Sequence, residues 1–364
     1  MSTIAVGAIT DESGGTTATI NSYTPTASNM AGRNRIINGD MRIDQRNAGA
    51  AVTVGTGSNF VVDRFTSTNT TATGTITGQQ ATLGNSKSIK LTATAAVTDL
   101  TTNKYVYGVK HRPEAQNVFD LNGKSVTFSF KVETNWAGNL PVAVLNSAFN
   151  RSYVVDTAIV SGTNTVSITL PMEAATVAAN DNSVGLEITI GFNNEATYRT
   201  ATTGSWIAGL FWVSTSSTQW TKTINNYINV TEVQLEEGSA ATPFEHRSYG
   251  TELALCQRYL PAFNGTGYIG QGFAYSTTQW VCMMPSIVTP RTTPTGLTVS
   301  SSAHFNFSNG SLGEVVCSTI TLATPQGEAS LFIGGTVASG LTAGQSGMLR
   351  SLSGGQLLFT GCEL

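Results

Sequence analysis

Few side chains in this sequence are of the types that carry out catalysis. There are three histidines, His111, His246 and His304, and none lies in an HExxH or a GxSxG motif. Carboxylates are sparse, and no pair of them is spaced to flank a glycosidic bond, as glycoside hydrolysis requires. We therefore predict that the protein is not an enzyme, and we interpret His246 as a hydrogen-bonded structural residue.

Five tryptophans could instead bind sugars, because the CH-rich faces of sugar rings stack on exposed aromatic rings. Trp136 and Trp220 lie in polar, turn-like contexts and are predicted to be exposed. Trp280 begins a predicted strand and is the third candidate for glycan binding. Trp206 and Trp212 flank the apolar segment IAGLF and are expected in the core. For each of the five, burial in the core or in an interface remains the favoured alternative.

The four cysteines, Cys256, Cys282, Cys317 and Cys362, are far apart and form no CxxC motif, which argues against a zinc site. We interpret them as buried free thiols rather than as disulfides. Free thiols fit assembly in a reducing cytoplasm.

Charge and composition exclude several classes of protein. The net charge is −3, and only 11% of the residues are charged. Without an excess of Lys and Arg, we expect no nucleic-acid partner. No apolar run reaches the roughly 18 residues of a membrane span, so we expect no membrane insertion. The 40% of hydrophobic residues is too high for a disordered chain.

Alternating apolar and polar residues predict an all-β protein. Residues 125–134 place Val126, Phe128, Phe130 and Val132 on one face of a strand, and residues 88–95 alternate in the same way. Residues 279–285 are predicted as a short strand. The number and spacing of such segments predict a two-sheet sandwich over residues 34–245.

A short helix is predicted to join this sandwich to a second β domain. Leu253, Cys256 and Leu260 share one face of a helix over residues 250–260, which Thr251 would cap and Pro261 would end. This helix lies in a linker over residues 246–260. Residues 261–364 are again rich in strand patterns and are expected to form a second, C-terminal β-sandwich domain.

Residues 1–33 form a distinct N-terminal segment with few large apolar residues, so they cannot bury enough surface to fold alone. We interpret them as an extended arm held by a partner. Packing on the protein's own chain or its own oligomer is the alternative.

Three strings resemble tail-fibre and related adhesion proteins of tailed bacteriophages: NRIINGDMRIDQRN (34–47), VVDRF (61–65) and VQLEEGSAATPFEHRSYGTELALCQRYL (233–260). In that family they open and close a jelly-roll domain similar to carbohydrate-binding modules. The resemblance implies a jelly roll over residues 34–245, and a homotrimeric virion protein attached to another virion protein through residues 1–33. It further implies adsorption to host surface polysaccharide and assembly in the host bacterial cytoplasm. A head fibre or capsid decoration protein is the alternative, and a glycan-degrading tailspike is a weaker one.

The same resemblance raises the question of calcium, because jelly-roll carbohydrate modules often hold a structural calcium between the start and the end of the domain. Asp40 and Asp44 open this domain, Glu236 and Glu237 close it, and carboxylate oxygens suit Ca²⁺. The favoured alternative is that these acids are solvated or paired with one of the arginines Arg42, Arg46 or Arg64. In particular, Asp40, Arg42 and Asp44 alternate along the sequence and would form a salt-bridge ladder on one face of a strand. No other cofactor is predicted.

Overall fold

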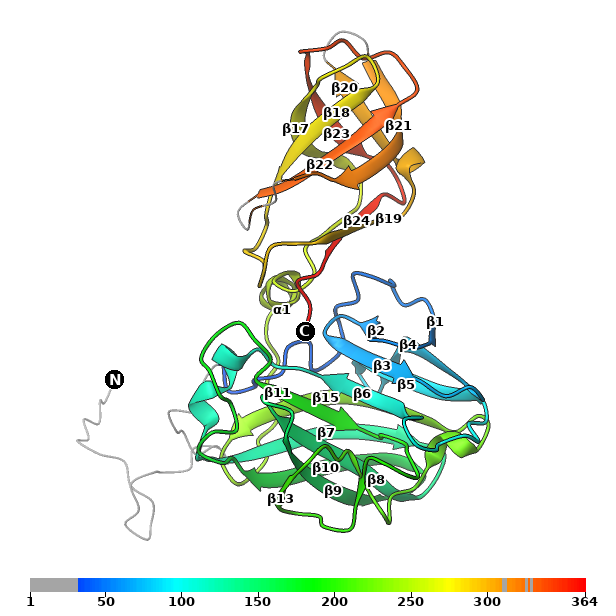
Figure 1. Cartoon of the computed structure of the whole chain (residues 1–364), viewed down its shortest axis with the longest axis vertical. Helices are drawn as coiled ribbons and strands as arrows, with labels where there is room; N and C mark the ends of the chain where they lie inside the picture. Colours follow the sequence, from blue (N-terminus) through cyan, green and yellow to red (C-terminus); the bar gives the residue numbers. More distant parts are fainter. Residues whose placement is uncertain (1–31, 310–312, 325–326, 328–329) are drawn as a thin grey trace, which may run out of the picture.

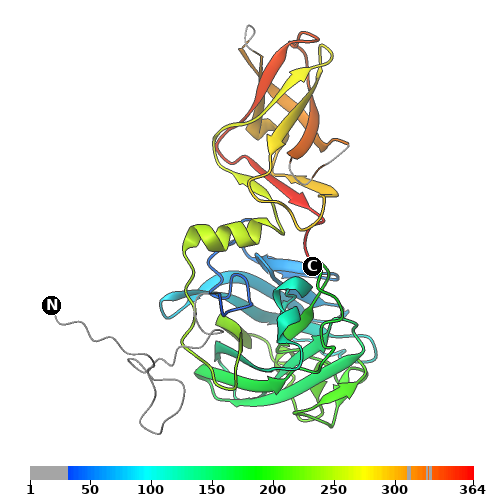
Figure 2. The same ribbon diagram turned by 90° about the vertical axis from the view of Figure 1, so that its left-hand side faces the viewer.

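A computed structural model describes residues 32–309, 313–324, 327 and 330–364. It shows a β-sandwich and a smaller β-barrel stacked end to end, with one short helix between them (Figures 1 and 2). The predicted all-β class is confirmed. The arm predicted over residues 1–33 lies outside the described residues, apart from Gly32 and Arg33.

The sandwich consists of two facing sheets that are antiparallel throughout. The six-stranded sheet has the order β1 (Val52–Val54), β4 (Thr75–Leu83), β5 (Ser86–Ala95), β15 (Tyr227–Glu237), β7 (Ser125–Thr134) and β10 (Gly162–Pro171). The seven-stranded sheet has the order β13 (Trp206–Ala208), β9 (Arg151–Ile159), β8 (Gly138–Asn146), β11 (Leu186–Ile190), β6 (Val106–His111), β3 (Phe65–Asn69) and β2 (Asn59–Val62). A parallel pair, β12 (Arg199–Thr200) and β14 (Val213–Ser214), lies outside both sheets.

Strand β7 shows why the sequence folds in this way. It runs over the predicted residues, and Val126, Phe128, Phe130 and Val132 are buried in the core between the sheets. Because side chains alternate along a strand, the same register leaves Lys131 and its polar neighbours on the outer face. The buried apolar area on these strands supplies the main stabilisation of the sandwich.

Helix α1 (Tyr249–Gln257) follows the sandwich and lies between it and the barrel (Figure 2). Ser248, rather than the predicted Thr251, caps it, because the Ser248 hydroxyl accepts a hydrogen bond from the Thr251 N–H. Cys256 is fully buried on the face of the helix that contacts Ile37 and Ile43 of the sandwich.

The C-terminal domain differs from the predicted sandwich, because its strands close into a barrel. The barrel order is β17 (Gly267–Ala274), β18 (Gln279–Pro285), β22 (Ser330–Val337), β21 (Gly313–Leu322), β20 (Phe305–Asn309) and β23 (Ser346–Ser351), with β23 pairing back to β17. A three-stranded sheet of β16 (Ala262–Asn264), β24 (Gln356–Thr360) and β19 (Gly296–Val299) lies between the barrel and the helix (Figure 1).

Two large rings fill the barrel interior. Trp280 stacks on Phe307, with ring centroids 5.3 Å apart, and both side chains are fully buried. Glycines make room for these rings, since a Cβ atom on Gly347 would lie 2.4 Å from the Phe307 ring and one on Gly335 would lie 2.5 Å from Trp280. Cys282 and Cys317 belong to the same core. All four cysteines are buried and free, as predicted.

Candidate functional site

The three tryptophans predicted to bind glycans are not exposed. Trp136, Trp220 and Trp280 retain 8%, 1% and 0% of their accessible surface. The indole N–H of Trp136 donates to the Tyr227 carbonyl, and that of Trp220 donates to the Gly191 carbonyl. Polar neighbours in the sequence suggested exposure, but chain segments from elsewhere in the fold cover these rings. Their predicted role as an exposed stacking surface is therefore wrong.

The carboxylates considered for calcium have separate protein partners. Asp40 pairs with Arg42, and both oxygens of Asp44 accept backbone hydrogen bonds, from Asn47 and Gly49. No three Asp, Glu, His or Cys side chains in the described part of the chain come together as a metal site. The Asp40–Arg42 pair agrees with the favoured alternative, but residues 38–40 and 45–49 form turns and residues 41–44 are irregular, so no strand carries a salt-bridge ladder.

The two acids at the end of the sandwich are also held locally. Glu236 is fully buried and accepts hydrogen bonds from the N–H and the hydroxyl of Thr242 and from the Gln234 side chain. Glu237 pairs with Lys124 at 2.8 Å. The four acids therefore do not form the predicted calcium site.

The strings that carry the resemblance to phage proteins do come together. Residues 34–39 run beside the end of β15, where the Arg35 N–H donates to Leu235 and the Val233 N–H donates to the Gly39 carbonyl, both at 2.8 Å. Gly39 is required by this close approach, because a Cβ atom there would lie 2.2 Å from the Val233 oxygen. Segments almost 200 residues apart in the sequence thus lie side by side and close one end of the sandwich. We call this contact between residues 34–39 and the end of β15 the closure.

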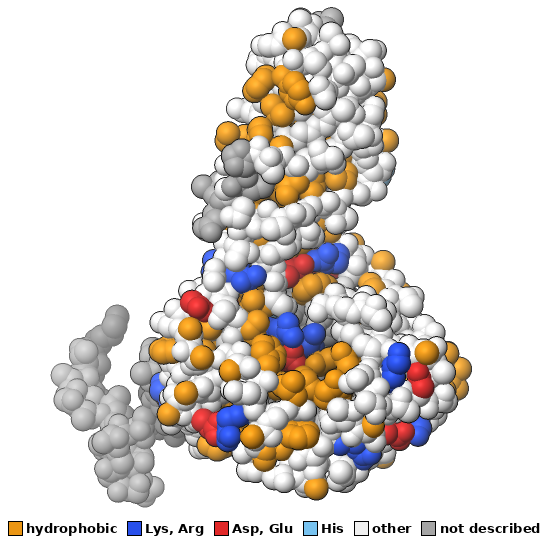
Figure 3. All heavy atoms as spheres, viewed as in Figure 1, with side chains coloured by type: hydrophobic (Ala, Val, Ile, Leu, Met, Phe, Trp, Pro, Cys, Tyr) orange, Lys and Arg blue, Asp and Glu red, His pale blue; other side chains and the backbone are white. Residues whose placement is uncertain are grey.

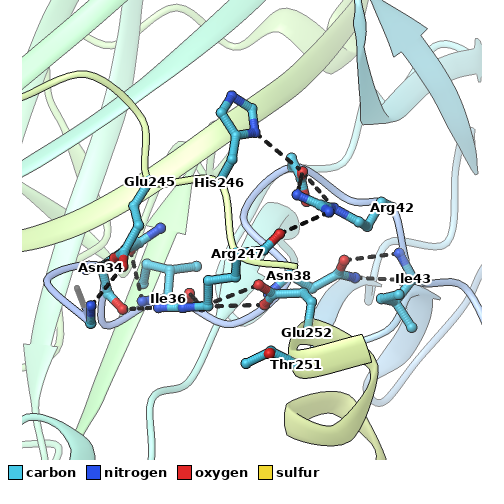
Figure 4. Close-up of polar contacts among 12 residues, drawn as sticks. Asn34, Ile36, Asn38, Arg42, Ile43, Glu245, His246, Arg247, Thr251 and Glu252 are labelled. Atoms are coloured by element: carbon cyan, nitrogen blue, oxygen red, sulfur yellow. Dashed lines mark hydrogen bonds and ion pairs between the residues drawn. The ribbon is translucent and has the colours of Figure 1, made fainter. Parts of the chain in front are cut away.

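Polar contacts extend this closure to helix α1 (Figure 4). Glu252 of α1 is almost fully buried, and its carboxylate accepts hydrogen bonds from the Asn38 N–H and from the Arg247 guanidinium. Arg247 also donates to the Ile36 carbonyl at 3.0 Å, and the Asn38 side chain bridges to Ile43. Since these groups satisfy one another away from water, they fix the helix on the sandwich.

The closure also reaches the C-terminal domain through Gln45. The backbone carbonyl of Gln45 accepts hydrogen bonds from the side chains of Asn264 and Gln356, at 3.2 and 2.8 Å. Arg46 beside it binds both oxygens of Glu363, at 2.6 and 2.7 Å. The segment that opens the sandwich therefore also anchors the barrel domain.

One candidate binding surface is the outer face of the seven-stranded sheet. Figure 3 shows a hollow over β6 and β11, with basic and acidic atoms on its floor and hydrophobic side chains around it. On this face Arg112 donates two hydrogen bonds to Glu187, at 2.7 and 2.9 Å, and the Trp212 indole donates to the other Glu187 oxygen at 2.7 Å. The Arg112 guanidinium also lies 5.3 Å from the centre of the Phe149 ring, within the roughly 6 Å of a cation–π contact.

Lys110 adds a second cation to this face. It is buried, its ammonium lies 4.6 Å from the centre of the Tyr107 ring, and its hydrogen-bond partner is the Ser58 hydroxyl at 3.5 Å. Burial lowers the pKa of Lys110 to about 8. Two cations therefore lie near the Glu187 carboxylate, whose hydrogen bonds to Arg112 and Trp212 make it a structural group.

A second candidate surface is the outside of the barrel. Tyr268 and Phe273 of β17 point outward with 55% and 49% of their surface exposed, and Met283 of the neighbouring β18 retains 57%. No strand is predicted over β17 from the sequence, because its three glycines have low β propensity. The signal that marks it is the spacing of Gly270 and Gly272 by two, which places glycines on the inner face and larger side chains on the outer face.

Comparisons with known proteins give structural neighbours only. No protein-family model matches the chain, and no curated protein matches its sequence. Among solved structures, it is similar to the enzymatically active domain of tailspike protein 4 of bacteriophage CBA120, at 9% identity and a TM-score of 0.31, over 56% of this chain and 21% of that one. The match thus spans about a fifth of the length of that domain's chain.

Carbohydrate-binding modules also occur among the neighbours. A family 4 module matches at 12% identity and a TM-score of 0.27, over 55% of this chain and 98% of that one. A family 61 module, solved in complex with β-1,4-galactotriose, matches at 9% identity and a TM-score of 0.28, over 57% and 99% of the two chains.

Within the described residues, no helix has the length and hydrophobicity needed to cross a membrane.

Proposed function

We propose that this protein is a bacteriophage virion fibre that binds host surface glycans and performs no chemistry on them. The observation that carries the proposal is the closure between residues 34–39 and the end of β15, continued by Glu252 of α1. The strings that resemble phage tail-fibre proteins are the ones that build this closure. They therefore act together as the structural unit that joins the sandwich to the terminal barrel.

The arrangement of the two domains supports a role in adhesion. The barrel lies at the opposite end of the molecule from the bulk of the sandwich, with its outer surface accessible around β17 (Figures 1 and 3). A closed barrel has no free strand edges, so it presents side chains rather than backbone to a ligand. In this proposal the virion holds the N-terminal segment, and the barrel faces the host.

The proposal of binding without catalysis is supported by the state of the buried carboxylates. Each buried carboxylate among the described residues accepts a hydrogen bond from another group of the protein. These carboxylates are Asp40, Asp63, Glu114, Glu187, Glu236 and Glu252. Carboxylates held in this way serve the fold rather than proton transfer to a substrate. Reducing-end release from host polysaccharide would contradict this part of the proposal.

Adsorption competition tests the function directly. Purified full-length protein should block adsorption of the phage that carries it and should bind the surface polysaccharide of the host. Its solution mass by light scattering should be near three times the chain mass of 38.2 kDa, as expected for the homotrimer that the resemblance to tail fibres implies. Linking three weak sites in one trimer would raise avidity. Protein that neither blocks adsorption nor binds the polysaccharide would overturn the proposal. Immunogold labelling of particles would distinguish a tail fibre from a head fibre or decoration protein.

A further inference from the structure

Three hollows follow one another along β17, and together we call them the β17 groove. The first, of about 430 Å³, lies between α1, residues 43–45 and the start of the C-terminal domain. The second, of about 570 Å³, and the third, of about 340 Å³, lie on the outside of the barrel. Ile269 lines both the first and the second hollow, and Gln271 and Met348 line both the second and the third. The groove is therefore continuous from the helix to the barrel.

The groove carries almost no charge. Asp44 is the one charged side chain that lines it, and both of its oxygens already accept backbone hydrogen bonds, at 3.1 and 2.7 Å. The remaining lining combines aromatic and aliphatic side chains with amides and hydroxyls. Each hollow includes at least one such polar group, for example Gln257 in the first, Gln271 in the second and Ser308 in the third.

Tyr268 offers an aromatic ring that is held in position on this groove. More than half of its surface is exposed, and its hydroxyl donates to Glu314 at 3.4 Å. Glu314 is itself fixed by Arg350 at 2.6 Å and by Asn306 at 2.9 Å. Arg350 and Asn306 pair with each other across β23 and β20, and Arg350 pairs with Tyr268 across β23 and β17. The ring is thus oriented before any ligand arrives.

We infer that the β17 groove binds an extended, uncharged polysaccharide chain, with a sugar ring stacked on Tyr268 and hydroxyl groups bonded by Gln271 and the other amides. This inference rests on the proposed function and assigns its binding surface. Neutral sugars present apolar CH faces and many hydroxyls, which matches a lining of aromatic rings and neutral hydrogen-bonding groups. A continuous groove of three hollows fits a linear chain of several sugars better than it fits a single small molecule.

A second copy of the chain is the competing occupant, because Met283 and Met348 expose 57% and 39% of their surface. Exposed methionines and aromatic rings are common in protein interfaces. However, an apolar protein face would bury the side chains of Gln271 and Ser308 without giving them partners, at a cost for each group. Polysaccharide hydroxyls would satisfy them.

Binding to polysaccharide arrays tests the inference with two groove variants and a matched control. The full-length protein, Tyr268→Ala, Gln271→Ala and Tyr275→Ala would be applied to neutral O-polysaccharides and to acidic capsular polysaccharides. Tyr275 is a suitable control, because it is a barrel tyrosine with 50% exposure that does not line the groove. We expect wild type and Tyr275→Ala to bind neutral chains equally, and Tyr268→Ala to bind roughly tenfold more weakly through loss of the aromatic contact. Gln271→Ala should also weaken binding, and salt should have little effect.

The possible outcomes distinguish a failure of the groove assignment from a failure of the proposed function. If wild type binds neutral polysaccharide and Tyr268→Ala binds equally well, the groove assignment is wrong while the proposed function stands. Binding restricted to acidic polysaccharides and lost in salt would also overturn the groove, and would favour the surface around Lys110 and Arg112. If Met283→Glu converts an oligomer into a monomer in light scattering, the groove is an interface between copies. If wild type binds no polysaccharide at all, the proposed function fails and the groove assignment fails with it.

Discussion

The side-chain amide of Gln45 donates a hydrogen bond of 2.7 Å to one oxygen of Asp63, and the Gln45 backbone N–H donates to the other oxygen at 3.0 Å. The same glutamine accepts hydrogen bonds from Asn264 and Gln356 of the C-terminal domain. A single buried carboxylate in the sandwich is therefore linked, through one residue, to the junction with the barrel.

The pKa of Asp63 makes this junction sensitive to pH. Burial raises it from 3.8 to about 7, against the opposing effect of the Gln45 hydrogen bonds. Between about pH 4 and pH 7 the folded state thus holds a proton that the unfolded state has lost, so the contribution of Asp63 to stability falls as pH rises through this range. We expect Asp63→Asn to remove that contribution. Urea unfolding of both proteins at pH 4, 5.5 and 7 gives the free energy of unfolding at each pH. This free energy should fall less with rising pH in the variant than in wild type. An equal fall in the two proteins would contradict the assigned pKa.

Removing the carboxylate of Glu252 should destabilise the closure between the sandwich and the helix. Glu252→Ala would leave the partly buried Arg247 guanidinium without its acidic partner, and loss of one partner from a buried pair costs about 3–5 kcal/mol. Glu195→Ala is the control, because Glu195 and its partner Lys222 are both solvent-exposed and their pair contributes little. The midpoint of denaturant unfolding should move to a much lower denaturant concentration in Glu252→Ala and hardly move in Glu195→Ala. Equal displacements would show that Glu252 has no special role.

A methyl group on Gly347 should loosen the barrel. Its Cβ atom would lie 2.4 Å from the Phe307 ring, so Gly347→Ala must disturb the stack between Phe307 and Trp280. The reactivity of Cys282 and Cys317 with a thiol reagent reports this change, because both thiols are buried in the same core. We expect faster labelling in Gly347→Ala than in wild type. Gly55→Ala, which places its methyl group where no atom lies within 4 Å, should label at the wild-type rate.

Replacing Trp220 should affect stability and leave glycan recognition intact. Its ring is buried and its indole N–H bonds to the Gly191 carbonyl at 2.9 Å. Trp220→Phe removes this hydrogen bond and part of a buried ring, while the Asn193 side chain still donates to the same carbonyl at 2.8 Å, so we expect a net loss of about 1 kcal/mol. Thermal unfolding should shift downward, while polysaccharide binding measured well below the transition should match wild type. Loss of binding with unchanged stability would return Trp220 to the list of glycan-binding candidates.

Local sequence determined the elements whose strand or helix pattern depends on neighbouring residues, while β17 with its three glycines was not predicted. Strand β7 spans the residues predicted from alternation, and β18 spans a predicted short strand. The helix, predicted over residues 250–260, forms over Tyr249–Gln257 and ends before Leu260. The burial of the free cysteines followed from their residue type and spacing. Each of these properties can be deduced from a short window of the chain.

Tertiary structure decided which surfaces are available for binding. Alternation on β17 and β18 is the same whether the strands form a sandwich or a barrel, so closure between β17 and β23 could not be deduced from it. Trp136 and Trp220 have polar neighbours, but segments distant in the sequence supply the carbonyls that their indoles bond and the atoms that cover them. Tyr268 remains exposed because barrel closure turns its face outward. Exposure is a property of how distant segments pack, and for that reason only the folded chain could identify the binding groove.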